Sequence, residues 1–208
     1  MPPKAKYTKN EIVGIALKLA RKNGFESITT RDIARELGAS TRPIFTYFKS
    51  MDELKSEVLR SAVKIYDGYA ERGLKEPIPF LGYGISLYRF AVEESNLFKL
   101  LFLTPFGGRL SGAREIMQRS KERVRETLKN VYKIDDKSAD FFFEQLWLVG
   151  HGISSVVAMG ASRYSEEDII KIYTMFSVSI YKAMKEIPGF VDGAFDSSDI
   201  FTKLIDNK

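Results

Sequence analysis

ITTRDIARELGASTRPIFTYFK, residues 28–49, predicts two short helices joined by a tight turn. Thr29 followed by Asp32 is a capping-box-like start, because the threonine hydroxyl can accept a hydrogen bond from the amide of residue 32. Gly38 can take the left-handed conformation that ends a helix. The apolar residues between them share one narrow face: Ile33, Ala34 and Leu37.

The second helix of this pair is basic and rich in hydroxyl groups. Ser40 is a plausible cap, and Pro43 is tolerated because first-turn amides have no intrahelical partner to lose. Ile44 and Phe48, four residues apart, would anchor the helix to the core. The side chains expected to face outward are Thr41, Arg42, Thr46 and Tyr47, with Lys49 at the end. This pattern is typical of a DNA-reading helix-turn-helix; the alternative is a helical hairpin whose polar side is only solvated.

The flanking segments extend the pair to a three-helix unit. Thr8 and Glu11 form a capping box that opens a helix to about residue 22, and Phe25 and Ile28 would close the small core. A further capping box at residues 50–53 opens a long helix to about residue 73. This long helix would connect the unit to the rest of the chain.

With these features in place, residues 8–60 resemble the TetR family of one-component transcriptional repressors. The matching residues are Ala16 through Gly24-Phe25, Ile28 through Ala34, Leu37 through Ser40, Ile44 through Ser50, and Glu53-Leu54. The chain departs from the family pattern at Arg42-Pro43, where a small residue is common, and at Phe45, where tyrosine is common. These departures affect which operator sequence the helix would read, and they leave the assignment as a DNA-binding unit unchanged.

Chemistry divides the expected DNA contacts into two groups. Thr41, Arg42 and Thr46 would read base edges, with arginine preferring guanine. Thr30, Arg31, Tyr47 and Lys49 would hold phosphates, helped by helix amino ends. Ser40 and Pro43 complete the predicted DNA-binding set.

The distribution of charge along the chain favours binding of a polyanion by its N-terminal end. Residues 1–50 hold ten Lys/Arg against four Asp/Glu, whereas the remaining residues hold 22 against 23. Lys4, Lys6 and Lys9 are expected to form a mobile arm that attracts DNA without reading sequence, or else a solvated tail. The chain has no cysteine, which excludes disulfides and fits the cytoplasm. No apolar stretch is long enough for export or for spanning a membrane.

The rest of the chain shows helical periodicity and no convincing strand, so the expected fold is all-α. We expect a DNA-binding domain at residues 1–50 and a larger effector-binding and dimerisation domain at residues 51–208. The helices expected after residue 73 span about 80–94, 95–103, 113–132, 137–160 and 166–185, with a terminal turn at 197–205. Val131 is assigned to the buried stripe of the 113–132 helix.

Helices 137–160 and 166–185 are the predicted homodimer interface. The first is apolar on more than one face and rich in small residues, so it has two surfaces to bury. The same pair dimerises TetR-family proteins, and helix-turn-helix units usually act as two-fold pairs on a palindromic operator. The alternative is a central helix buried wholly within one monomer.

The resemblance also implies an effector pocket in the C-terminal domain. Its expected walls are Tyr83, Tyr88, Phe90, Phe98, Phe102, Phe106, Phe142, Trp147 and His151, which suit an apolar or aromatic compound. Trp147 followed by His151-Gly152 is similar to a pattern in a subgroup of TetR-like C-terminal domains. A lone histidine without a carboxylate at ligand spacing is more often a core or interface residue than a ligand contact, and a metal site is not expected.

Catalytic patterns are missing from the sequence, so no enzyme activity and no cofactor are expected. Glu93-Glu94 is interpreted as a solvated helix end, and Glu166-Glu167-Asp168 as a cap. The leading hypothesis is a ligand-responsive dimeric regulator, most simply a repressor. The alternatives are a DNA-binding regulator without a small-molecule effector and a helical module that binds proteins.

Overall fold

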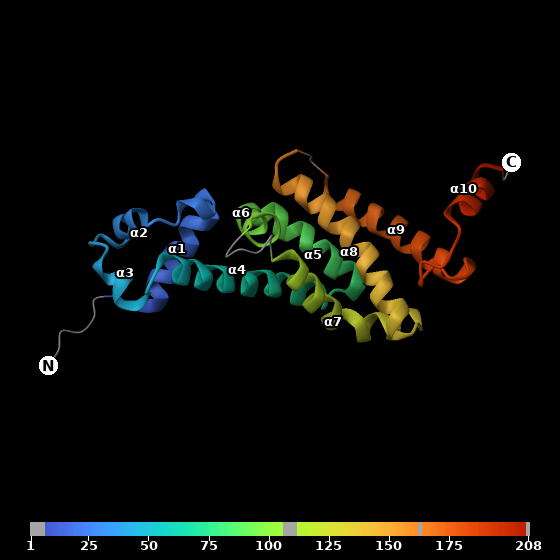
Figure 1. Ribbon diagram of the computed structural model, residues 1–208, viewed down its shortest axis with the longest axis horizontal. Coiled ribbons are helices and arrows are strands. Elements are labelled where there is room, and N and C mark those ends of the chain that lie inside the picture. The colour runs from blue at the N-terminus through green and yellow to red at the C-terminus, as the bar shows by residue number, and fades with distance from the viewer. Residues whose placement is uncertain (1–6, 106–111, 162–163, 207–208) are drawn as a thin grey trace.

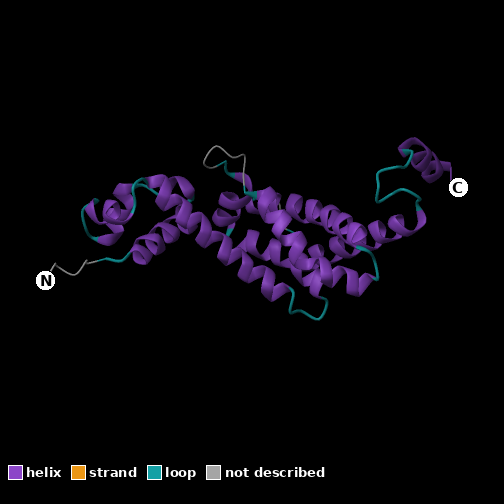
Figure 2. Cartoon of the chain, turned by 60° about the horizontal axis from the view of Figure 1, so that its bottom comes forward, coloured by secondary structure: helices purple, strands orange, loops and turns teal. Residues whose placement is uncertain are grey.

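The computed structural model describes residues 7–105, 112–161 and 164–206, and every regular element in these ranges is helical. The all-α prediction is confirmed. A small N-terminal unit lies at one end of an elongated molecule and a larger helical body at the other (Figure 1). A view turned by 60° shows the same separation (Figure 2). In the described ranges, no helix is long and apolar enough to cross a membrane.

The N-terminal unit contains α1 (Lys9–Asn23), α2 (Thr30–Leu37) and α3 (Arg42–Tyr47). The Thr8–Glu11 capping box opens α1, and the Thr29 hydroxyl accepts from the Asp32 amide at the start of α2. Gly38 ends α2 in the left-handed conformation, with φ of 61°. The sequence therefore predicted these boundaries because local hydrogen bonds fix them.

Ile44 and Phe48 are buried, as predicted, and hold α3 against the core. The start of α3 differs slightly from the expected capping: Thr41 precedes the helix without a side-chain cap, and the Ser40 hydroxyl accepts from the Arg42 amide at 3.4 Å. Pro43 lies in the first turn. The turn before α3 thus holds residues 40–42 at the solvent-facing end of the unit.

Helix α4 (Met51–Gly73) runs from this unit into the body and packs along α5 (Pro79–Glu93). Where the two helices cross, Gly73 and Gly82 face each other. A Cβ built on Gly73 would lie 2.4 Å from the Gly82 carbonyl oxygen, and one on Gly82 would lie 2.3 Å from the Gly73 oxygen. The backbones therefore touch at this crossing, which only glycine allows.

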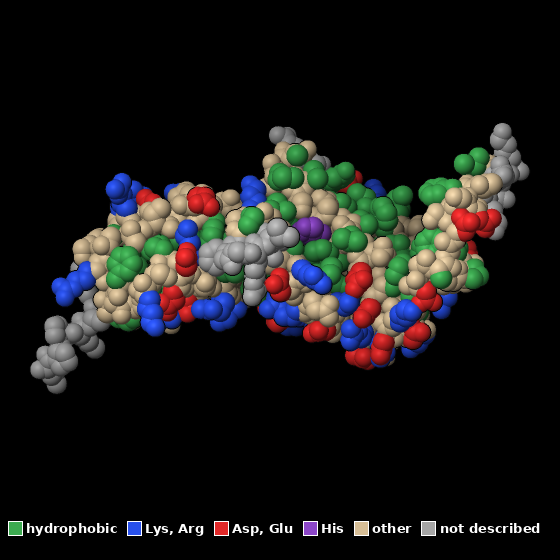
Figure 3. Space-filling model, viewed as in Figure 1, with side chains coloured by type: hydrophobic (Ala, Val, Ile, Leu, Met, Phe, Trp, Pro, Cys, Tyr) green, Lys and Arg blue, Asp and Glu red, His purple; other side chains and the backbone are tan. Residues whose placement is uncertain are grey.

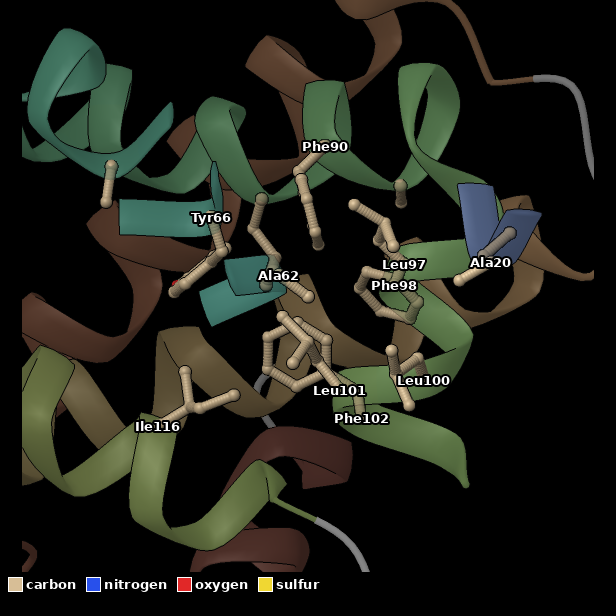
Figure 4. Close-up of a cluster of buried hydrophobic side chains, with 14 of the residues drawn as sticks. Ala20, Ala62, Tyr66, Phe90, Leu97, Phe98, Leu100, Leu101, Phe102 and Ile116 are labelled. Carbon is tan, nitrogen blue, oxygen red and sulfur yellow. The ribbon is translucent and has the colours of Figure 1, made fainter. Parts of the chain in front are cut away.

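The body continues with α6 (Ser95–Phe98), α7 (Ala113–Tyr132), α8 (Asp136–Ala158), α9 (Glu166–Glu186) and α10 (Ser197–Asp206). The segment 95–103, expected as one short helix, is α6 followed by a π-helical turn over Lys99–Leu103. This turn directs Leu100, Leu101 and Phe102 into a core that also holds Tyr66 and Phe90 (Figure 4). Local π-helical turns are rare and occur often at functional sites.

Two sequence-based assignments of burial are wrong. Val131, assigned to a buried stripe, is 56% exposed, because Leu128 and Tyr132 form the inward face of the last turns of α7 and Val131 lies beside that face. Glu94, interpreted as part of a solvated helix end, is only 8% exposed. It is buried because Arg21 of α1 covers it with an ion pair, a contact between segments far apart in sequence.

Candidate nucleic-acid interface and C-terminal aromatic cluster

The outward face of α3 carries most of the predicted base-reading residues. Ser40, Thr41, Arg42 and Thr46 are exposed, and Pro43 is half-buried beside them. The Thr46 hydroxyl donates to the Arg42 carbonyl at 3.1 Å, which leaves its oxygen free to accept another hydrogen bond. This face therefore presents one guanidinium and several hydroxyl groups together, as a helix that reads a major groove requires.

Tyr47 is not simply outward-facing, as the sequence suggested. Its ring is half-buried, and its hydroxyl donates to the Tyr7 carbonyl at 2.7 Å. The Tyr7 hydroxyl in turn donates to the Leu37 carbonyl at 2.8 Å. These two bonds tie the chain before α1 to the ends of α2 and α3, so Tyr47 also has a structural role that periodicity did not reveal.

Phe45 is an exposed aromatic residue on α3 that the sequence reasoning left without a role. It is 52% exposed and neighbours Arg42 and Thr46 on the helix surface. The signal was available, because Ile44 and Phe48 define the inward face and residue 45 must then point elsewhere. An exposed ring here is suited to apolar contact with a thymine methyl group.

The amino end of α2 and the end of α3 supply the predicted phosphate contacts. Thr30 begins α2 and is half-buried, Arg31 is exposed, and Lys49 is exposed just beyond α3. Thr29 donates to Asp32, which lowers the pKa of that carboxyl. Asp32 also pairs with Arg35 at 2.7 Å, whereas Arg31 and Lys49 are exposed cations on this surface.

Lys9, one of the three lysines expected in a mobile arm, lies in helix α1 instead. Lys4 and Lys6 lie outside the described residues, whereas Lys9 is the first residue of α1. Its ammonium forms an ion pair with Glu57 of α4 at 2.8 Å. Hydrogen bonds from Arg60 and Lys9 lower the pKa of Glu57 to about 2. Lys9 therefore ties α1 to α4 rather than extending toward DNA.

Five of the nine predicted effector-pocket residues form one continuous aromatic cluster: Phe90, Phe98, Phe102, Trp147 and His151. Phe98 and Phe102 lie 4.8 Å apart between ring centroids, and both contact His151. The Trp147 and His151 rings are stacked at 4.6 Å with 6° between their planes. The π-helical turn places Phe102 against this stack, so segments from α6 to α8 meet here.

Within residues 7–105, 112–161 and 164–206, neither Trp147 Nε1 nor His151 Nδ1 has a hydrogen-bond partner. Trp147 is 8% exposed, and His151 is partly buried but reaches the surface (Figure 3). Burial lowers the pKa of His151 below its ordinary value of 6.5. Buried donors normally find an acceptor, so this pair marks the cluster as a candidate contact for a ligand oxygen.

The remaining predicted pocket residues are distributed elsewhere. Tyr83 and Trp147 line an apolar cavity of about 10 Å³ between α5, α8 and α9. Phe142 packs with Tyr132, and the Tyr88 hydroxyl donates to the Tyr164 carbonyl at 2.6 Å. Phe106 lies outside the described residues. The cavity is large enough only for a water-sized group, so a larger compound requires neighbouring side chains to move.

Tyr173 of α9 was missed by the sequence reasoning and closes one side of this cavity. Its ring packs against Gly84 and Gly150, where added Cβ atoms would lie 2.7 and 1.6 Å from ring and hydroxyl atoms. The two glycines, which lie far apart in sequence, are thus needed together for one side chain. Because this packing of Tyr173 depends on two distant glycines, the periodicity of a single helix could not reveal it.

Hydrogen bonds join α1 of the N-terminal unit to α6, the short helix that carries Phe98 of the aromatic cluster. Arg21 of α1 pairs with Glu94 through two hydrogen bonds, one of them 2.9 Å from Nε to Oε2, and the interaction raises the pKa of the guanidinium. The Asn96 side chain donates to the Arg21 carbonyl at 2.9 Å. We call these three residues the α1–α6 clasp. Phe98, at the end of the same short helix α6, contacts His151.

We expect His151 to titrate below pH 6.5 in the folded protein, because burial disfavours the imidazolium. A lowered histidine pKa gives stability that is present above the unfolded value and is lost as pH falls through the folded value. NMR of the chain's single histidine measures the pKa directly. A pKa at or above 6.5 would contradict the buried, unpaired imidazole.

Comparison with protein-family models matches residues 12–58 to the family described as bacterial regulatory proteins, tetR family. The match covers α1, α2, α3 and the first part of α4. The comparison with curated proteins found no match to the chain. Residues 12–58 therefore form a DNA-binding domain of the tetR type, which supports a transcriptional regulator.

Proposed function

We propose that the protein is a dimeric transcriptional regulator, most simply a repressor, that binds a palindromic operator and is released by a small molecule. The observation that carries the proposal is the exposed face of α3, with Arg42 and Thr46 on a helix of a tetR-type domain. Residues 1–50 would bind DNA and residues 51–208 would dimerise and bind the effector. Such a regulator would work in the cytoplasm, where the DNA is.

The exposed apolar residues of α8 and α9 support the dimer. They include Leu148, Ile170, Met175, Phe176 and Val178. Figure 3 shows exposed hydrophobic side chains grouped along the upper side of the body. Met175 alone is 68% exposed. Contiguous apolar surface of this kind is characteristic of protein interfaces. A two-fold pair would place two copies of α3 on neighbouring half-sites, about one helical turn of DNA apart.

The aromatic cluster supports an effector that combines an apolar ring with a hydrogen-bonding oxygen. Phe98 and Phe102 supply apolar surface, and Trp147 Nε1 and His151 Nδ1 are available to the oxygen. The Trp147 and His151-Gly152 pattern is the basis for placing the body in the related C-terminal subgroup. An effector that binds the released state more tightly by about 1–3 kcal/mol would weaken operator binding ~5- to 150-fold.

The α1–α6 clasp is our proposed route from effector to DNA. A compound that moves Phe98 would move α6, and Asn96 and Glu94 would then shift α1 through Arg21. Helix α4 provides a second connection, since it packs against both α1 and α5. Movement of either element would change the distance between the two α3 helices of a dimer.

We expect Arg42→Ala to weaken operator binding by about 1–3 kcal/mol and to relax specificity, because it removes a base contact. Lys49 is a proposed phosphate contact on the same surface, so Lys49→Ala should weaken binding to all DNA sequences alike. Competition gel shifts, with a duplex selected from a random pool and a scrambled competitor, separate the two effects. Unchanged discrimination by Arg42→Ala would reject its base-reading role.

Two other functions are distinguishable by simple measurements. A regulator without a small-molecule effector would bind the selected duplex and show no thermal shift with any compound. A helical protein-binding module would fail to bind duplex DNA at any salt concentration. The exposed cations of the α2–α3 surface favour DNA over this last alternative.

A further inference from the structure

Phe45 differs from every other large apolar residue of the N-terminal unit. Among residues 7–77, all of which the structure describes, it is the one large apolar side chain that is exposed, with 52% of its surface open to solvent. The neighbouring Ile44 and Phe48 are buried and fix the inward face of α3. A single exposed apolar residue is ordinary on a protein surface, so the place of this ring, beside the base-reading residues, is what points to a partner.

The spacing of Phe45 from Arg42 matches the spacing of base pairs in DNA. Arg42 is the first residue of α3, and Phe45 follows three residues later, so the two side chains are neighbours on the helix surface. Three residues advance a helix by about 4.5 Å, and successive base pairs are about 3.4 Å apart. A helix that places Arg42 on one base pair therefore brings Phe45 to the next pair.

The chemistry of the ring selects among the four bases. A phenylalanine ring offers no hydrogen bond, so it would leave a covered donor or acceptor of a base without a partner. In the major groove, thymine alone of the four bases presents an apolar group, its C5 methyl. Arg42, in contrast, has the paired donors that fit guanine O6 and N7. The two neighbouring side chains thus suit two different bases.

We propose that Phe45 is a specificity residue that contacts a thymine methyl group on the base pair next to the guanine contacted by Arg42. Each half-site would then contain a guanine and a thymine on neighbouring pairs. This inference rests on the base-reading role of Arg42 in the proposed function and adds an apolar determinant to it. The ring recognises the methyl group itself, so 5-methylcytosine would satisfy it as thymine does.

Uracil substitution tests the contact, because uracil differs from thymine only in lacking the C5 methyl. In a duplex selected from random sequence by the full-length protein, the guanine is located by its change to 7-deazaguanine. That change should weaken binding by the parent protein but not by Arg42→Ala. The thymine on the neighbouring pair is then replaced by uracil. Fluorescence anisotropy should show binding about fourfold weaker, as expected for the loss of one buried methyl-sized group.

Variants at position 45 connect the methyl group to the ring. Phe45→Ala should bind the thymine and uracil duplexes equally, whereas Phe45→Leu, which keeps an apolar side chain, should keep part of the difference. Both changes alter an exposed residue, so the variants should fold, and their melting temperatures check this. Lys49→Ala is the matched control on the same surface: it should weaken binding to both duplexes while keeping the fourfold ratio.

A second pair of duplexes differs by the same methyl group in another base. With cytosine or 5-methylcytosine at the thymine position, the parent protein should bind the methylated duplex about fourfold more tightly. Phe45→Ala should bind both alike. This comparison separates recognition of the methyl group from recognition of the rest of the thymine edge.

Three results would overturn the methyl contact. The first is equal binding of the parent protein to the thymine and uracil duplexes, including the case in which Phe45→Ala weakens both, which would place the ring on the DNA backbone. The second is a fourfold ratio that survives in Phe45→Ala. The third is a selected duplex in which no thymine lies next to the guanine contacted by Arg42. Failure to bind any duplex would instead reject the proposed function itself.

Discussion

Gly73→Ala should lower the free energy of unfolding by about 3 kcal/mol, among the larger effects expected of one methyl group. The added Cβ would lie 2.4 Å from the Gly82 carbonyl oxygen and 2.7 Å from its carbon. These are backbone atoms of α5, so no side-chain rotation relieves the contact. The helices α4 and α5 would have to separate, and their packing is the most extensive in the body.

Gly68→Ala is the matched control, because Gly68 lies in the same helix with only the tip of Arg72 within 4 Å of an added Cβ. Alanine inside a helix is favoured over glycine by about 1 kcal/mol, so this variant should be slightly more stable than the parent. Urea denaturation followed by circular dichroism compares the two. Equal stabilities would contradict the backbone contact at the α4–α5 crossing.

Arg21→Ala should destabilise the protein by about 2–3 kcal/mol. It leaves Glu94 buried without its partner, and loss of one member of a buried ion pair is usually costly. We place the effect below the usual range because the arginine side chain itself is half exposed. The Asn96 bond to the Arg21 backbone would remain.

Lys18→Ala on the same helix tests whether the burial of Glu94 is the reason for the loss of stability expected for Arg21→Ala. Lys18 and Glu36 form an exposed pair at 3.8 Å, and such pairs contribute about 1 kcal/mol or less. Thermal unfolding of both variants and of the double variant Arg21→Met/Glu94→Leu separates the loss of an ion pair from the burial of an unpaired charge. The double variant should recover most of the stability, since no charge is left buried. A loss for Arg21→Ala no larger than for Lys18→Ala would refute the clasp.

Local signals in the sequence predicted the N-terminal unit well. Thr8, Thr29 and Ser50 each cap the helix that follows, and Gly38 ends α2 as expected. Such features depend on residues within four positions of one another, so they can be read without knowing the fold. Periodicity also predicted the exposure of Thr41, Arg42 and Thr46, but not the half-buried ring of Tyr47.

What the sequence missed depends on contacts between distant segments. Glu94 is buried only because Arg21 reaches it from another helix, and Tyr173 fits only because two distant glycines leave room. The expected aromatic residues that the structure describes do lie inside the body, but periodicity could not tell the His151 cluster from the separate group around Phe142. Exposed Val131 was likewise misassigned because the inward face of the last turn of α7 is formed by Tyr132, which packs on Phe142 and Tyr181.

The central claim is that α3 enters the major groove of DNA as one half of a two-fold pair. Hydroxyl-radical footprinting of the full-length protein on a duplex selected from random sequence tests it most directly. The proposal predicts two protected segments related by a dyad, centred about one helical turn apart, and a higher protein concentration needed to protect both on Arg42→Ala, as expected for a loss of about 1–3 kcal/mol. Absence of any protected segment, or a single one without symmetry, would contradict the account.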